Sequence, residues 1–148
     1  MSLQVADNKA PGYRTNPTHR VDIGAATGRL RIAFKGTVLA DSAHALVVDE
    51  TKYERVYYLP RADVRMEHLR RTAHGSHCPY KGDASSWTVV VGGEEAENAA
   101  WSYETPFDEA APLRGLVAFW IKRLPGAVVS VNEEKGSDPF NLVESVTY

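Results

Sequence analysis

The sequence predicts a single, mainly β domain with two helices. Its 148 residues suit one domain with one core. Short stretches in which apolar and polar residues alternate recur between residues 29 and 103, and such alternation is typical of half-buried strands. Helical spacing of apolar residues is confined to two segments, near 63–70 and near 112–124. The pattern therefore predicts strands as the main element, with a short helix and a longer amphipathic one.

The strands follow one another along the first half of the chain. In "RLRIAFKG" the apolar residues Leu30, Ile32 and Phe34 alternate with polar neighbours, which gives one buried and one wet face. "TVLADS", "HALVVDE" and "ERVYYLP" read as further short strands, the last one ending at Pro60, which has no amide hydrogen to donate. "SWTVVVGGEEAENAAWSY" predicts two more strands around a Gly92–Gly93 turn.

The two helices differ in the strength of their signals. Near 63–70, Asp63 can cap a short helix whose apolar side holds Val64 and Leu69. The helix near 112–124 has Pro112 in its first turn and Pro125–Gly126 after its end. Its apolar residues recur at steps of three and four; they are Leu113, Leu116, Val117, Trp120, Ile121 and Leu124. This spacing predicts a helix that faces the core, with Trp120 buried.

Two segments lie outside the predicted domain, one at each end of the chain. Residues 1–15 are polar and lack periodicity, so we expect a surface leader, followed by the domain over residues 16–125. Residues 126–148 form an acidic C-terminal tail with weak strand-like pieces. Residues 1–31 carry five basic residues against two acidic ones, whereas the tail carries four acidic residues against one basic residue. Oppositely charged ends can pair between copies, so a homo-oligomer is one possibility, and independently solvated ends are the other.

Composition restricts the location and the partners. The formal net charge is −2, so the chain has no general attraction to nucleic acid phosphates. It contains no apolar run long enough to cross a membrane and no secretory leader. Its single cysteine cannot form an internal disulfide. We therefore expect a cytoplasmic protein with a small-molecule partner, no nucleic acid or membrane partner and no cofactor.

The stretch "HGSHCPYKGDASSW", residues 74–87, holds the candidate catalytic residues Cys78 and Lys81. Pro79 and Gly82 favour a rigid turn that presents Tyr80 and Lys81. A nearby positive charge favours the reactive thiolate of Cys78, and Lys81 can supply it. His77 and Cys78 are neighbours on an extended chain and point to opposite sides, which makes His77 a poor base for this thiol. A lone cysteine packed inertly in the core is the alternative.

Five further residues are candidates for ligand binding. Tyr80 and Trp101 can line a pocket for a planar ligand. His77 and Glu50 supply polar groups, and the planar fork of Arg61 can grip an anion unless it pairs with a nearby acid. A metal site is not predicted: the cluster of His74, His77 and Cys78 offers three ligands, and a tetrahedral site needs a fourth from another segment.

Five stretches, in this order, carry a resemblance: "TVLADSAHALVVDE", "YYLPRADVRMEHL", "HCPYKG", "AAWSYETP" and "GLVAFW". They resemble the domain-of-unknown-function family 427, also filed as predicted nucleotidyltransferases, over roughly residues 16–125. The resemblance implies a β-tent fold, in which coiled sheets enclose a cleft and one helix packs alongside. Nucleotidyl transfer normally needs magnesium-binding carboxylates and a phosphate cradle. No glycine-rich phosphate loop precedes a helix here, and no closely spaced pair of aspartates ends a strand.

Together these features predict a domain that binds a small anionic or planar ligand in a cleft beside the turn at residues 78–82. Whether it also catalyses a reaction is left open. The alternative is a noncatalytic interaction module or a homo-oligomer.

Overall fold

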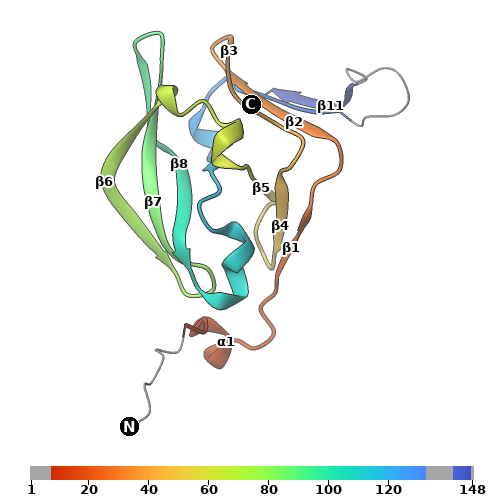
Figure 1. The fold of residues 1–148 in the computed structure, drawn as a ribbon, viewed down its shortest axis with the longest axis vertical. Helices are drawn as coiled ribbons and strands as arrows, with labels where there is room; N and C mark the ends of the chain where they lie inside the picture. The colour runs from red at the N-terminus through yellow and green to blue at the C-terminus, as the bar shows by residue number, and fades with distance from the viewer. Residues whose placement is uncertain (1–7, 133–141, 148) are drawn as a thin grey trace.

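Three antiparallel sheets make up most of the molecule, which confirms the mainly β prediction (Figure 1). The computed structural model describes residues 8–132 and 142–147. The first sheet has the order β1 (Val21–Ala25), β4 (Leu46–Glu50), β5 (Val56–Tyr58). The second has the order β11 (Leu142–Thr147), β10 (Val128–Asn132), β2 (Arg29–Phe34), β3 (Thr37–Ser42). The third has the order β6 (Leu69–Cys78), β7 (Gly82–Val91), β8 (Glu94–Pro106), β9 (Ala118–Phe119).

Short helices connect these strands. An α-helical turn, α1 (Gly12–Thr15), precedes the first sheet. The others are 3₁₀ turns: η1 (Arg61–Asp63), η2 (Met66–His68), η3 (Asp108–Leu113) and η4 (Ile121–Arg123). Within the described ranges, no helix has the length and apolar character needed to cross a membrane.

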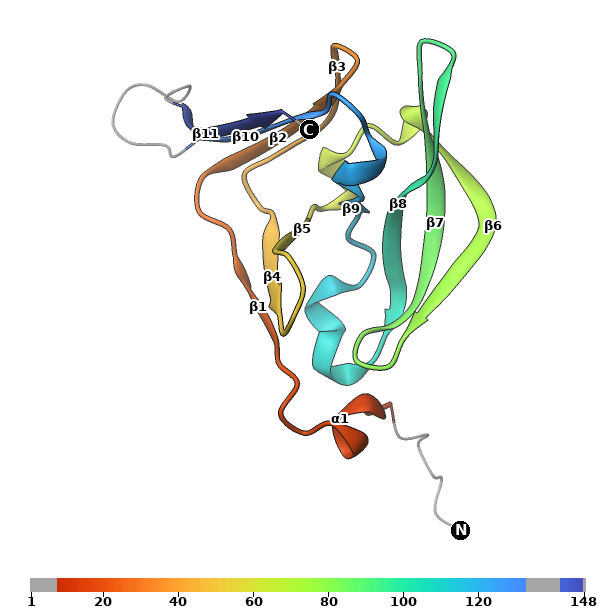
Figure 2. The same ribbon diagram turned by 180° about the vertical axis from the view of Figure 1, so that it is seen from behind.

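The sheets stand apart at one end and are joined through the middle. Strands β6, β7 and β8 form one side of the molecule, β1 and β4 form the other, and α1 lies at the lower end (Figures 1 and 2). The segment after β8 links the two sides. Its strand β9 pairs with β8, and the backbones of Val117 and Leu59 exchange two hydrogen bonds of 2.8 Å next to β5. Both residues are fully buried, so this junction lies in the core.

The alternation predicted for residues 29–36 is present in β2. Leu30, Ile32 and Phe34 are buried, and Arg29 and Arg31 are exposed. The two arginines both bind Asp41 on β3, at 2.5 and 3.0 Å. Burial tends to raise the pKa of this carboxyl, but the hydrogen bonds from the two arginines outweigh it and lower the pKa. One face of β2 therefore builds the core, while the other is a charged surface.

The predicted amphipathic helix near 112–124 is wrong. These residues form the end of η3, then β9, then η4. Gly115 has a φ of 72°, a left-handed conformation that breaks a helix. The residues that follow use their backbone groups to pair with Leu59 and with β8 instead of with each other.

The apolar spacing of this segment has a different origin from the one predicted. The segment passes between two sheets, so residues on several sides of it are buried, among them Leu113, Val117 and Leu124. A segment buried on all sides is apolar without a helical repeat. Trp120, expected in the core, is 45% exposed.

The predicted short helix near 63–70 is also corrected. The chain makes two separate 3₁₀ turns, η1 and η2, and Leu69 already begins β6. Between the turns Val64 is extended and forms a β-bridge with Ala40, while the amide of Arg65 donates to the carbonyl of Leu39. This pairing with β3 prevents a continuous helix.

Both ends of the described chain contact the sheets. Strand β10, which falls in the predicted acidic tail, pairs with β2 from Val128↔Ala33 to Asn132↔Arg29. At the other end, the amide of Gly12 donates to the carbonyl of Pro79 at 3.0 Å. The acidic residues of the tail between 133 and 141 lie outside the described residues. The domain boundaries stay a prediction.

We expect Gly82→Ala to destabilise the fold, because Gly82 has a φ of 125° and a Cβ there would lie 3.2 Å from the Cα of Pro106. The free energy of unfolding, measured by urea denaturation, should fall by about 1–3 kcal/mol. Gly24→Ala is the matched control, because a Cβ at Gly24 meets no atom within 4 Å. Its effect should stay within about 1 kcal/mol of the parent. Equal effects of the two substitutions would contradict the strain at Gly82.

Candidate functional site

A buried carboxylate, that of Glu50 at the end of β4, lies at the centre of the candidate site. The ammonium group of Lys81 contacts its Oε1, and Nε2 of His19 lies 2.8 Å from its Oε2. The side chains are only 10%, 8% and 7% exposed for Glu50, Lys81 and His19. Buried charges are stable only when paired and hydrogen-bonded, so these three residues depend on one another.

Pairing between distant strands brings the three residues together. Strand β1 pairs with β4 in a register that sets Val21 opposite Glu50 and places His19, two residues earlier, beside the carboxylate. Lys81 comes from the tight turn between β6 and β7, where Cys78 is paired with Gly82. The carbonyl of Lys81 accepts a hydrogen bond from the amide of Phe107 at 2.9 Å, which fixes the turn against the end of β8.

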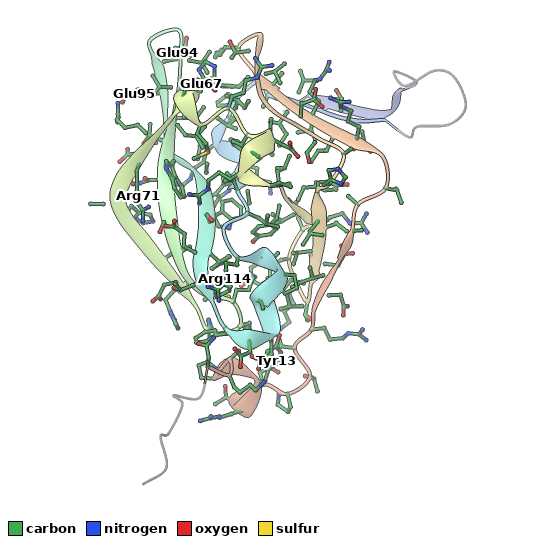
Figure 3. All side chains as sticks on the ribbon, in the orientation of Figure 1. Tyr13, Glu67, Arg71, Glu94, Glu95 and Arg114 are labelled. Atoms are coloured by element: carbon green, nitrogen blue, oxygen red, sulfur yellow. The ribbon has the colours of Figure 1, made fainter. Side chains whose placement is uncertain are left out.

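Aromatic rings cover this ion pair at the lower end of the molecule. The ring of Tyr80 stacks on His19, with centroids 3.8 Å apart, and Tyr13 meets Tyr80 edge-on at 5.1 Å. Figure 3 labels Tyr13, a residue of α1, at this end. A Cβ at Gly12 would lie 2.6 Å from the Tyr80 ring, so only glycine allows α1 to pack this closely. The rings limit the access of water, which strengthens the electrostatic attraction around Glu50.

Two tyrosines and the cysteine pack in the buried cluster next to the ion pair. Burial raises the pKa of Tyr58 and of Tyr103, and the nearby Glu50 and Cys78 raise both further. The two phenols therefore stay protonated and can donate hydrogen bonds. Cys78 packs against the buried cluster that contains Tyr58 and Tyr103, and the indole of Trp101 donates to the hydroxyl of Tyr58 at 3.3 Å.

A cleft of about 620 Å³ opens between β4 and β5 on one side and β8 and β9 on the other, and Glu50 is part of its wall. This volume is in the range of small-molecule sites. The aromatic residues that line it are Tyr53, Tyr57, Tyr58, Trp101, Phe119 and Trp120. The charged residues that line it are Glu50, Lys52, Glu54, Arg55, Lys122 and Arg123.

Two of these rings are unusually exposed for their type. Tyr53 is 69% exposed and Trp120 is 45% exposed. The guanidinium carbon of Arg123 lies 3.8 Å from the centre of the Trp120 ring, close enough for a cation–π contact. Lys122 pairs with Glu54 at 3.2 Å, whereas Lys52 has no ion pair in the part of the chain that the structure describes. The charged lining thus holds four cations and two carboxylates, and one of those carboxylates is already bound by Lys81 and His19.

Residues 22–130 match the family model described as "Domain of unknown function (DUF427)". The chain belongs to the DUF427 family. This confirms the resemblance drawn from the sequence. Comparison with curated proteins gave no match.

The DUF427 match covers Glu50, Lys81 and the cleft-lining strands, but it begins after His19 and Tyr13. The third partner of the ion pair and part of its aromatic cover therefore lie on the segment that precedes the matched region.

Several residues predicted as site residues of this DUF427 chain do lie together. Glu50 and Lys81 are in direct contact, and Tyr80 covers them. Trp101 lines the cleft. Cys78 packs behind the wall with Tyr103 and is not among the cleft-lining residues. The functional roles assigned to these residues stay predictions.

His77 and Arg61 lie elsewhere. His77 points away from Cys78 along β6 and bonds Asp83 at the surface, at 2.7 Å. Arg61 contacts Ser102 and Glu104 rather than Glu50. His74 does line the cleft. Among the residues described, no three or more His, Cys, Asp or Glu side chains form a group that could hold a metal ion.

Among the residues of the site, His19 has no signal in the sequence. It lies in a polar stretch, 31 positions from Glu50, and only the pairing of β1 with β4 connects them. Tyr58 and Tyr103 are aromatic residues on predicted strands that could face a pocket, with ordinary core packing as the alternative.

Replacing Lys81 should be far more costly than replacing an exposed lysine. In Lys81→Met, Glu50 stays buried with His19 as its remaining side-chain partner among the described residues, and removing one partner of a buried ion pair costs about 3–5 kcal/mol. The urea-determined free energy of unfolding should fall by about that amount. Lys122→Met, which breaks the exposed pair with Glu54, should change it by less than about 1 kcal/mol.

A double-mutant cycle with Glu50→Gln separates the charge pair from the packing of the lysine stem. The double variant should be more stable than the sum of the two single losses predicts, by about 1–3 kcal/mol. Simple additivity would mean that the contact contributes nothing and that Lys81 only fills space.

Proposed function

We propose that the cleft binds a small, planar ligand that carries an anionic group at one end and a hydrogen-bond donor at the other. The observation that supports this most directly is the contrast between the two parts of the cleft. Its wall holds the Glu50 carboxylate, whereas its rim carries one carboxylate, Glu54, which pairs with Lys122, and four cations: Lys52, Arg55, Lys122 and Arg123. A ligand that spans both needs a donor toward Glu50 and a negative group toward the rim.

The aromatic lining supports the planar shape of the ligand. Trp101 and Trp120 lie edge-on to each other with centroids 6.3 Å apart, and both face the cleft. Flat rings favour stacking and edge contacts with other flat groups. Trp120 is 45% exposed and lines the cleft, so its ring is accessible to a ligand.

In this proposal Glu50 contacts the ligand and Lys81 is a positioning residue. Each oxygen of Glu50 has one partner, and a carboxylate oxygen can accept a second hydrogen bond. Lys81 and His19 fix the orientation of the carboxylate. Cys78 has no place in the cleft lining, so the proposal is one of binding and assigns Cys78 no bond-forming step. The single cysteine, which cannot form an internal disulfide, supports a cytoplasmic location as part of this proposal.

A set of three matched compounds tests both ends of the ligand. 4-Aminobenzoate has a carboxylate and an N–H donor on opposite ends of a ring, benzoate lacks the donor, and aniline lacks the anion. Titration followed by tryptophan fluorescence should give saturable binding, with 4-aminobenzoate binding about tenfold more tightly than either fragment. Equal affinities, or no saturation by any of the three, would contradict the proposal.

Variants locate the binding. Trp120→Ala and Lys52→Gln should each weaken 4-aminobenzoate binding by about fivefold or more, since both residues line the cleft and are exposed enough to be replaced without harm to the fold. Trp87→Phe is the control, because Trp87 is buried outside the cleft. Loss of binding in Trp87→Phe alone would place the ligand elsewhere.

The exposed rings also favour a second candidate, a noncatalytic module that associates with a copy of itself. Tyr53 and Trp120 form an apolar surface at the cleft mouth that a second chain can cover. Light scattering should then give a dimer mass at both low and high salt, and Trp120→Ala should shift the mass toward the monomer. A dimer held by the charged chain ends would instead dissociate at high salt. A monomer under all conditions would rule out this candidate.

A further inference from the structure

A second polar cluster lies on the other face of the sheet formed by β6, β7 and β8, away from the cleft. On β7, Ser86 lines the cleft, and its neighbours Ser85 and Trp87 point to the opposite face, as alternate residues of a strand do. On that face Ser85 lies directly opposite Ser102 of β8. The oxyanion cluster, as we call it, consists of Arg61, Arg71, Ser85, Ser102 and Glu104, over the ring of Trp87.

Two guanidinium groups in this cluster flank a single carboxylate. Nη2 of Arg71 lies 2.8 Å from Oε1 of Glu104, and Nη1 of Arg61 lies 3.6 Å from Oε2. The arginines come from different elements, η1 and β6, and their guanidinium carbons lie 5.2 and 5.3 Å from the Trp87 ring centre. The ring thus forms a common floor under both cations.

Hydroxyl groups add to the donors around the same carboxylate. Oγ of Ser85 donates to Oε1 of Glu104 at 2.7 Å and accepts from Arg71 at 2.9 Å. Ser102, which is fully buried, accepts from Arg61 at 3.3 Å. The hydrogen bond from Ser85 and the charges of Arg71 and Arg61 lower the pKa of Glu104, so it is ionised at neutral pH.

The donors of the cluster exceed what Glu104 can satisfy. Two positive charges face one negative charge, which leaves an excess of one. Nε of Arg61 is buried and has no hydrogen-bond partner among the described residues. The 3.6 Å separation from Glu104 leaves Nη1 of the same arginine without a close acceptor. An unsatisfied buried donor is costly, so a better acceptor in this place would be stabilising.

We propose that the oxyanion cluster binds the phosphate group of a small ligand, and that Glu104 occupies the place of the phosphate in the free protein. A phosphate dianion matches the charge of two arginines and accepts their paired N–H groups. It can also accept the hydroxyl hydrogen of Ser85. The cluster is open to solvent, because the Arg71, Arg61 and Glu104 side chains are 57%, 38% and 33% exposed.

The position of the cluster separates this site from the cleft. Figure 3 labels Arg71 on β6, on the side of the molecule away from β1 and β4. Glu50, the last residue of β4, borders the cleft. None of the five residues of the oxyanion cluster is among those that line the cleft. Phosphate binding here and ligand binding in the cleft therefore stand or fall separately.

Titration of the full chain with inorganic phosphate, followed by calorimetry, tests the proposal. Glu104→Gln removes the competing negative charge and should strengthen phosphate binding about tenfold, whereas Arg71→Gln should weaken it about tenfold. Acetate, with one negative charge, should bind the Glu104→Gln variant at least about tenfold more weakly than phosphate does. Far-ultraviolet circular dichroism checks that each variant is folded.

Neighbouring residues supply controls of equal charge. Arg70 is the neighbour of Arg71 on β6, so its side chain points to the opposite face of that strand, where it pairs with Glu95 at 2.7 Å on the surface. Arg70→Gln and Glu95→Gln change net charge as the test variants do, and each should alter phosphate affinity by less than about twofold. Equal shifts in test and control variants, or no saturable phosphate binding to folded Glu104→Gln, would overturn the proposal. Tighter, Arg71-dependent binding of a short oligonucleotide than of phosphate would overturn the assignment to a small ligand.

Discussion

The burial of one carboxylate constrains much of this structure. Glu50 is shielded from water at the end of β4, and an ionised group in that position needs partners with fixed geometry. Its partners come from two other parts of the chain, His19 before β1 and Lys81 in the β6–β7 turn. The ion pair therefore joins the first sheet, the third sheet and the N-terminal segment at one point. The cleft lies next to this ion pair, between the first and the third sheet.

The segment between β8 and β10 joins the first and third sheets at a second place, away from the ion pair. It pairs with β8 through β9 and with Leu59 through Val117, so it behaves as an interior strand interrupted by turns. Because its residues are covered from more than one side, it leaves Trp120 as the one large ring turned outward among them. The same path thus fixes the spacing of the cleft walls and supplies an aromatic residue to the mouth.

The sequence predicted those features that depend on residues close together in the chain, such as a strand and a turn. The alternation of Leu30, Ile32 and Phe34 identified a strand, and Pro79 and Gly82 identified the turn that carries Lys81. The Lys81 side chain does not project outward as predicted, because it is buried against Glu50. The prediction of a helix near 112–124 was wrong because the spacing of apolar residues indicates only which residues are buried. Here the segment is buried between two sheets, which produces the same spacing without a helix. His19 could not be found, because its contact with Glu50 depends on a register between strands far apart in sequence. Arg61 was a candidate anion-binding residue because of its chemistry, but its contact with Glu104 depends on the packing of η1 against the third sheet, which brings together residues far apart in sequence.

The close packing of Gly12 under Tyr80 has a practical consequence for how this domain is divided. The region shared with the DUF427 family begins at residue 22. The α1 turn before it is nevertheless bonded to the rest of the molecule, because the amide of Gly12 donates to the carbonyl of Pro79. The amide of Ala10 also donates to the Glu109 carboxylate, at 2.9 Å. A fragment cut at the family boundary would keep Glu50 and Lys81 while losing His19 and the cover over them. A fragment that keeps His19 and this cover therefore has to begin before the family match, at a residue that precedes α1.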